Sequence, residues 1–224
     1  MSGRRIAIFG GAFDPIHNAH LAVARAAADR FHLDRVLFVP AYCPPHKGIT
    51  HASYEDRVRM VEIACAEAAP QGVRFEASRL EEGTERSYSI DTINRLRATL
   101  DPADELFFLI GADAFADLRT WHRWRDVAQS VRFIVASRPG YMYDAPAEAR
   151  VDRLEEKESA TSSSSIRQAI QAGKVELDAP PGVLEYIRSH YLYGPRLADP
   201  TDLWRLRAEI PINVGSSHNL ALVQ

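Results

Sequence analysis

Four short apolar stretches constrain the fold of this chain more than any other feature of its sequence. The first two end at turn residues, Gly10 and Pro40, and segments with the apolar spacing of amphipathic helices separate the four. Strands that are apolar on both faces and alternate with such helices indicate a parallel sheet covered on both sides. The sequence therefore predicts an α/β, doubly wound parallel sheet with right-handed crossovers. The stretches are 6–9, 36–39, 106–110 and 131–136.

Weaker signals extend this pattern through the first 100 residues. Residues 73–77 alternate between apolar and polar side chains, as strand residues do. Residues 21–31 have helical spacing and many alanines, so we expect a helix that begins near His20. Ser53 and Ser89 are expected to cap two further helices, because serine is a preferred N-cap residue.

The pattern weakens after Pro139, and residues 141–150 are interpreted as a loop or linker. A helix is predicted at 166–170, since Gly173 follows it as a C-terminal glycine. Pro180 and Pro181 are expected to open a last helix. The predicted organisation is one domain at 1–194, whose small C-terminal helical part is about 160–194, and an extension of no assigned role at 195–224.

Composition excludes several classes of protein. The 27 Lys and Arg against 30 Asp and Glu leave a net charge of -3, which argues against binding nucleic acid by bulk charge. The two cysteines exclude a disulfide framework and a four-cysteine zinc site. No apolar run approaches the roughly 20 residues that span a bilayer, and none resembles a signal peptide. We therefore expect a cytoplasmic protein with no nucleic-acid or membrane partner; the sequence leaves a homo-oligomer open.

The strongest chemical signal lies between the first predicted strand and the first predicted helix. Adjacent glycines, Gly10 and Gly11, let backbone N–H groups approach an anion closely. His17 and His20 are three residues apart at the helix entry, so both rings can face one ligand. The helix N-terminus adds free N–H groups and the positive end of a dipole. Together these features predict a phosphate site with imidazole donors.

Two alternatives remain open for the histidine pair. The rings could bind a metal, although no Cys, Asp or Glu obviously completes a ligand set. They could also be structural, as helix caps without chemistry. The glycines do not form G-x-G-x-x-G, so an ordinary dinucleotide-binding turn is disfavoured.

The segment from Gly10 to His20 resembles the G-G-[ST]-F-D-P-x-H-x-G-H signature of nucleotidyltransferases. It departs from that signature at Ala12, which lacks a hydroxyl, and at Ala19, which would be strained if its φ were positive. Further segments resemble bacterial nicotinate-nucleotide adenylyltransferases, in family order across residues 5–194. They are P-P-H-K at 44–47, S-Y-S-I-D-T at 87–92, G-A-D at 111–113, T-W-H-R-W at 120–124, R-P-G-Y at 138–141 and S-S-S-S-I-R at 162–167.

The resemblance implies a Rossmann-like transferase of NAD biosynthesis. It would join ATP and nicotinate mononucleotide into deamido-NAD and pyrophosphate, by direct in-line attack of the mononucleotide phosphate on the α-phosphorus. Mg²⁺ would bind through the ATP phosphates and not through side chains. Two alternatives are a relative that uses nicotinamide mononucleotide or another phosphate, and a nucleotide-binding module without activity.

The resemblance also implies roles for individual residues. The implied catalytic residues are His17, His20 and Arg167. The implied ATP-binding residues are Gly10, Gly11, His17, His20, Asp113, Ser162, Ser163 and Arg167. The implied residues for nicotinate mononucleotide are Ala12, Phe13, Lys47, Ser89, Trp121 and His122.

These assignments have a physical basis and competing interpretations. Lys47 and Arg167 supply cationic donors suited to phosphates, while a lysine in a loop is often simply solvated. Asp113, after a strand, suits a ribose hydroxyl or a helix cap. Trp121 suits stacking on a pyridine ring or a place in the core. The serine run at 162–165 suits phosphate binding or a flexible linker.

Overall fold

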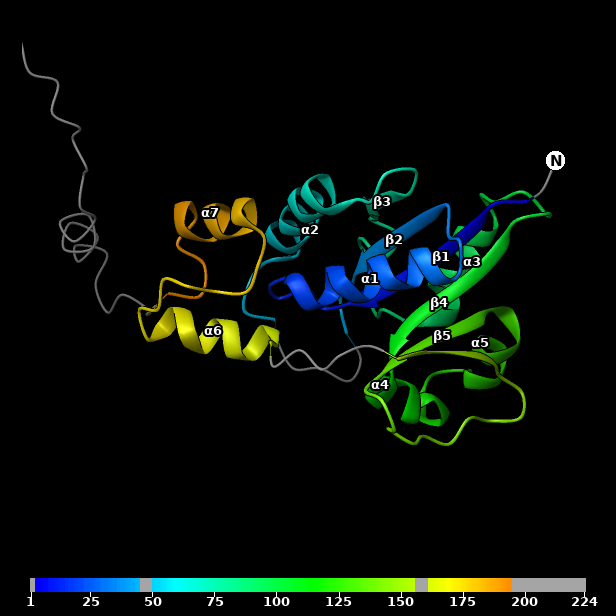
Figure 1. The fold of residues 1–224 in the computed structure, drawn as a ribbon. Coiled ribbons are helices and arrows are strands. Elements are labelled where there is room, and N and C mark those ends of the chain that lie inside the picture. Colours follow the sequence, from blue (N-terminus) through cyan, green and yellow to red (C-terminus); the bar gives the residue numbers. More distant parts are fainter. Residues whose placement is uncertain (1–2, 45–49, 156–160, 195–224) are drawn as a thin grey trace, which may run out of the picture. The chain divides into compact units, whose positions relative to one another are not determined.

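The computed structural model describes residues 3–44, 50–155 and 161–194. Residues Met1–Tyr193 form one compact unit, which Figure 1 shows as a ribbon. The extension predicted at 195–224 lies outside the described residues, and so does Lys47 among the predicted site residues.

A six-stranded parallel sheet forms the centre of this unit. Its order, β3-β2-β1-β4-β5-β6, begins in the middle, runs to one edge and then returns to the other side of β1. The predicted α/β, doubly wound parallel fold is confirmed. The strands are β1 (Arg5–Gly11), β2 (Arg35–Pro40), β3 (Arg74–Ala77), β4 (Glu105–Gly111), β5 (Arg132–Ser137) and β6 (Arg150–Glu155).

Helices cover both faces of the sheet. Neighbouring residues of each central strand point to opposite faces, so these strands contribute to a core on each side. Ala7 and Phe9 of β1 belong to the core on the side of α1 and α2, whereas Ile6 and Ile8 belong to the core on the side of α3, α4 and α5. The described helices are α1 (Asn18–Arg30), α2 (Tyr54–Ala68), α3 (Ser89–Arg97), α4 (Ala112–Ala116), the 3₁₀ helix η1 (Leu118–Thr120), α5 (Trp124–Ser130), α6 (Ser163–Gln171) and α7 (Pro181–Ser189).

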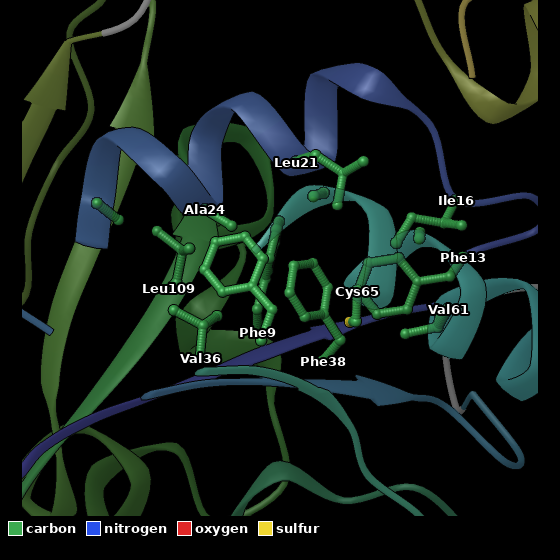
Figure 2. Close-up of a cluster of buried hydrophobic side chains, with 14 of the residues drawn as sticks. Phe9, Phe13, Ile16, Leu21, Ala24, Val36, Phe38, Val61, Cys65 and Leu109 are labelled. Atoms are coloured by element: carbon green, nitrogen blue, oxygen red, sulfur yellow. The ribbon is translucent and has the colours of Figure 1, made fainter. Parts of the chain in front are cut away.

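Aromatic rings fill the core on the α1 and α2 side (Figure 2). Phe9 and Phe13 meet edge to face at 5.7 Å between ring centroids, and Phe38 lies 5.8 Å from Phe13. Leu21 of α1 and Val61 of α2 close the cluster. This core reaches the loop after β1 and anchors Phe13 within it.

The sixth strand is the main element that the sequence analysis missed. Residues 141–149 form the expected loop, but β6, which begins at Arg150 and pairs with β5 along its length, was not predicted. Leu154 is the one buried residue of β6, and most of the others are polar or charged. An edge strand of this kind has no apolar run to reveal it. The short helices α4 and α5 were also not predicted.

Two helix starts differ from the predictions. α1 begins at Asn18, earlier than the expected start near His20, and His17 is its N-cap residue. The predicted cap at Ser89 is wrong, because Ser89 is the first residue of α3 and Tyr88 takes the cap position. The Tyr88 carbonyl accepts the N–H groups of Asp91 and Thr92, so the extended backbone at Tyr88 already opens the helix.

Other terminal signals are confirmed. The Ser53 hydroxyl accepts the Asp56 N–H at 3.1 Å and caps α2. Gly173 follows α6 with a φ of 71°, and Pro181 occupies the first turn of α7. Over the described residues, no helix is both long enough and apolar enough to span a membrane.

Candidate active site

The candidate site lies at the carboxyl ends of β1 and β4. These neighbouring strands continue into α1 and α4, whose buried residues belong to the cores on opposite faces of the sheet. Such a divergence leaves a crevice between the two strand ends, which is where open α/β sheets bind ligands.

Three large pockets adjoin one another in this crevice. The histidine pocket, of about 450 Å³, is lined by Phe9, His17, His20, Asp113, Ser137, Arg138, Tyr141 and their neighbours. The loop pocket, of about 510 Å³, is lined by Phe9, Gly10, Gly11, Ala12, Phe13, Asp14, His20, Thr50, His51, Ser163, Ser164 and Arg167. The tryptophan pocket, of about 630 Å³, is lined by Gly11, Ala12, Ser87, Tyr88, Ser89, Asp117, Trp121, His122 and their neighbours.

Shared walls connect the three pockets. His20 lines both the histidine pocket and the loop pocket. Gly11 and Ala12 line both the loop pocket and the tryptophan pocket. The structure thus brings most of the predicted site residues to one crevice. Ser162 lines none of the three pockets among the described residues.

The loop after β1 forms the central wall. A Cβ atom on Gly11 would lie 3.1 Å from the Phe13 ring, so only glycine fits there without a shift of that ring. Phe13 has a φ of 47°, and it carries the positive φ in this loop. Ala19 lies in α1 and shows no positive φ, so the strain considered for this replacement of glycine does not arise.

The rings of the two histidines pack against each other, tilted by 31°, at the entrance to α1. Their ring centroids lie 3.7 Å apart, and the His17 N–H donates to Nδ1 of His20 at 3.3 Å. Because Nδ1 of His20 accepts this bond, the proton of a neutral His20 ring lies on Nε2. His17 is 5% exposed, and burial lowers its pKa to about 4 despite the opposing charge of Asp178. His17 is therefore neutral at pH 7.

Helix α6 contacts the central loop through Arg167 and Ser163. Arg167 Nη1 donates to the Asp14 carbonyl at 2.7 Å, and Ser163 Oγ donates to the Pro15 carbonyl at 2.8 Å. Ser162 instead caps α6, where its hydroxyl accepts the Ser165 N–H at 3.1 Å. Residues 162–165 are thus a helix start, which excludes the flexible-linker interpretation.

Asp113 lies in the first turn of α4, but Gly111 is the N-cap residue. The Tyr141 hydroxyl donates to Asp113 Oδ1 at 2.9 Å. Ser137 and Arg138 line the same pocket. The R-P-G-Y resemblance covered Arg138 and Tyr141, but no role was predicted for either residue.

Trp121 packs on the core, as one of its two predicted alternatives requires, and it also lines the tryptophan pocket. Its ring meets Phe108 at 5.9 Å, and beside it the His122 ring stacks on Tyr88 at 4.2 Å. The Trp121 N–H donates to the Leu118 carbonyl at 3.0 Å.

Sequence reasoning missed two buried charged residues behind the loop. Asp14 is 4% exposed and Arg57 of α2 is 1% exposed. Asp14 lay in the motif without an assigned role. Arg57 gave no signal, because an arginine in an amphipathic helix is normally expected on the solvent face. Among the described residues, no cluster of three or more His, Cys, Asp or Glu side chains could hold a metal ion.

Comparison with known proteins gives the family. Residues 8–169 match the cytidylyltransferase-like family. A probable nicotinate-nucleotide adenylyltransferase of Solibacter usitatus is 62% identical over 191 residues, which cover 85% of this chain and 100% of the relative. The chain belongs to the nicotinate-nucleotide adenylyltransferase family. A Geobacillus thermodenitrificans relative, also described as a probable nicotinate-nucleotide adenylyltransferase, is 38% identical over 91% of this chain and 98% of its own.

Solved structures similar to this nicotinate-nucleotide adenylyltransferase family member support its fold. Nicotinic acid mononucleotide adenylyltransferase of Plasmodium falciparum, complexed with NaAD, has a TM-score of 0.70 at 19% identity, over 85% of this chain and 97% of that one. A Vibrio parahaemolyticus structure, titled a putative nicotinate-nucleotide adenylyltransferase, has a TM-score of 0.62 at 22% identity, over 85% and 95%.

Proposed function

We propose that this chain joins ATP and nicotinate mononucleotide into deamido-NAD and pyrophosphate. One observation carries the proposal: the backbone at Gly11 and Ala12 is a wall common to the loop pocket and the tryptophan pocket. A phosphate bound on each side of this wall would be adjacent to the other. Direct attack between two bound substrates requires such an arrangement.

The chemistry of each pocket favours a different part of the substrates. The histidine pocket would hold the adenosine of ATP, with Asp113 near a ribose hydroxyl. The loop pocket would hold the phosphates, next to Gly10, His20, Ser163 and Arg167, with His17 behind His20. Ser162 stays a predicted ATP contact, although its hydroxyl already caps α6.

The tryptophan pocket suits the acceptor nucleotide. Trp121 would stack on the pyridine ring, and Ala12, Ser89 and His122 would face the rest of the mononucleotide. Phe13, which lines the neighbouring loop pocket, would approach it through its backbone. A backbone N–H of Trp121 or His122 would suit the nicotinate carboxylate, because an anion is favoured by such donors. The Trp121 N–H is already donated to Leu118, so within this pair we now assign the role to His122 alone. Lys47 remains a predicted phosphate ligand outside the described residues.

In-line transfer requires stabilisation of the charge that builds up on the α-phosphate and the departing pyrophosphate. His20 would donate from Nε2, because its Nδ1 accepts the His17 N–H. Arg167 would add a fixed cation, since its Nη1 is held at the Asp14 carbonyl. His17 would act by fixing the ring position and tautomer of His20.

A magnesium ion would be held by ATP rather than by side chains. The carboxylate that lines the loop pocket is Asp14, and its oxygens already accept hydrogen bonds from His51, Ala52 and Tyr193. When bound, Mg²⁺ would neutralise phosphate charge. We also propose a cytoplasmic location, in keeping with the composition.

An assay of pyrophosphate release with ATP and each candidate mononucleotide tests this function. We expect kcat/KM for nicotinate mononucleotide to exceed that for nicotinamide mononucleotide by about tenfold or more, because one charge-assisted hydrogen bond contributes roughly 1.5–3 kcal/mol. Equal values would refute the substrate assignment. No pyrophosphate release with any mononucleotide would favour a binding module without activity.

A further inference from the structure

Residues far away in the sequence hold the loop after β1 in place through hydrogen bonds. Arg57 Nη1, in α2, donates to the Ala12 carbonyl at 2.8 Å. The Tyr193 hydroxyl, near the end of the described chain, donates to Asp14 Oδ1 at 2.8 Å. The His51 N–H donates to Asp14 Oδ2 at 2.7 Å, and the Ala52 N–H donates to Oδ1 at 3.1 Å.

Burial makes these bonds important for the loop. Asp14 and Arg57 are almost fully buried, and a buried charge is stable only when it is paired and hydrogen-bonded. Three donors and the nearby positive charge of Arg57 satisfy the Asp14 carboxylate. Loss of one donor would leave part of a buried carboxylate unpaired, and the loop would have to shift to compensate.

The same bonds fix the orientation of one peptide group. The carbonyl and the N–H of a trans peptide point in opposite directions. The Ala12 carbonyl points to Arg57, so the Phe13 N–H points away from Arg57. Phe13 has a positive φ of 47°, which a bulky residue keeps only where its surroundings impose it. Ala12 and Phe13 both line the loop pocket.

We propose that Tyr193 and Arg57 are positioning residues, which hold Asp14 and Ala12 from behind so that the Ala12–Phe13 peptide presents its N–H to substrate phosphate. This inference rests on the proposed function of the loop pocket. Tyr193 is also the last residue of the compact unit Met1–Tyr193. The active site therefore depends on the chain as far as its last tyrosine, although Tyr193 lines none of the three pockets.

The test compares Tyr193→Phe with Tyr191→Phe in the full-length chain. Tyr193→Phe removes the hydroxyl but keeps the ring that packs on the core. We expect kcat to fall about tenfold and the affinity for inorganic pyrophosphate, measured by calorimetry, to fall about threefold. Both should fall because the Phe13 N–H would be displaced in the transition state and in the pyrophosphate complex alike. Tyr191 is 57% exposed, so its substitution should change neither quantity.

Thermal stability separates positioning from a purely structural role. A structural tyrosine would lower Tm and leave both kcat per folded molecule and pyrophosphate affinity within twofold of wild type; that result would overturn the proposal. A second variant, Arg57→Lys, keeps the positive charge but not the guanidinium fork, and should reproduce the loss of kcat. Pyrophosphate binding needs no acceptor nucleotide. A wild-type enzyme that failed with nicotinate mononucleotide would therefore refute the proposed function, while the pyrophosphate affinities of the variants would still test the positioning role.

Discussion

The loop pocket and the tryptophan pocket share a wall but are built differently. Around the loop pocket, charged and hydroxyl side chains donate hydrogen bonds to backbone carbonyls. Arg167 donates to the carbonyl of Asp14, Ser163 to that of Pro15 and Arg57 to that of Ala12. In the tryptophan pocket, rings pack on rings, as Trp121 packs on Phe108 and His122 on Tyr88.

This difference assigns the two pockets different tasks. Donors held by several hydrogen bonds need no reorganisation when charge develops, so the loop pocket is suited to stabilising a transition state. Ring contacts are less directional and provide area for binding a flat group. We therefore expect substitutions in the loop pocket to act mainly on kcat, and substitutions in the tryptophan pocket to act mainly on KM.

The largest effect is expected from His20→Ala. Removal of one preorganised donor to a developing charge typically lowers kcat by about 100- to 1000-fold, with a much smaller change in the KM for ATP. Steady-state kinetics and thermal unfolding of the variant measure both. His190→Ala is the control, since His190 stacks on Tyr186 and lines none of the three pockets.

Two other results would change the assignment of His20. A lower Tm with kcat within about threefold of wild type, well below the loss expected for such a donor, would make it structural. Activity that followed zinc content while Mg²⁺ was supplied would make it a metal ligand.

The next largest effect concerns the pH dependence of stability through His17. Its folded-state pKa of about 4 lies below the roughly 6.5 of an unfolded histidine. Between these two pH values the unfolded chain binds more protons than the folded chain. The contribution of His17 to the free energy of unfolding is therefore present above about pH 6.5 and is lost as the pH falls towards 4. From pH 7 to pH 5 the free energy of unfolding should fall by about 2 kcal/mol through this group.

Urea unfolding of wild type and His17→Gln at both pH values measures this term. The loss between pH 7 and pH 5 should be smaller in the variant by about that amount. His190→Gln, which changes an exposed histidine, should keep the wild-type dependence. An identical pH dependence in His17→Gln and wild type would mean that His17 is not buried as a neutral ring.

A smaller effect is expected from Trp121→Leu. Loss of ring stacking should raise the KM for nicotinate mononucleotide about tenfold, because aromatic stacking on a base contributes roughly 1–3 kcal/mol. The KM for ATP should change little. Trp124→Leu is the matched control, since Trp124 packs on the same core but lines neither pocket. Equal changes in both KM values would contradict the division between the pockets.

The smallest effect is expected from deletion of residues 195–224. If the chain as far as Tyr193 completes both pockets, kcat should stay within about twofold of wild type, while solubility or association can change. The kinetics of the shortened chain measure this directly. A loss near a hundredfold would mean that the tail reaches the active site.

The sequence predicted the fold well where strands are apolar on both faces, and it failed where they are not. The stretches 6–9 and 106–110 lie in β1 and β4, next to each other in the sheet centre. The edge strand β6 has one buried residue and no comparable pattern. Apolar patterning reports burial, so it is silent about an element that stays largely at the surface.

The residues of the candidate site also divide into those that the sequence predicted and those that it did not. His17, His20 and Arg167 were predicted as site residues because several residues in family order resembled known motifs. Arg57 and Tyr193 were not, because the role of a side chain that acts from behind depends on which distant carbonyl or carboxylate it meets. Ser89 was misplaced because residue type alone does not fix the first residue of a helix.

The wall between the loop pocket and the tryptophan pocket consists, at Gly11, of main chain alone. In the proposed function two reactants would meet across it, and the product would then span both pockets. The two halves of that product would dissociate together, because either half still bound would keep the other at a high effective concentration. A molecule that links a pyridine nucleotide to an adenosine phosphate would benefit in the same way. The enzyme's tightest inhibitors should therefore be bridged compounds rather than mimics of either substrate.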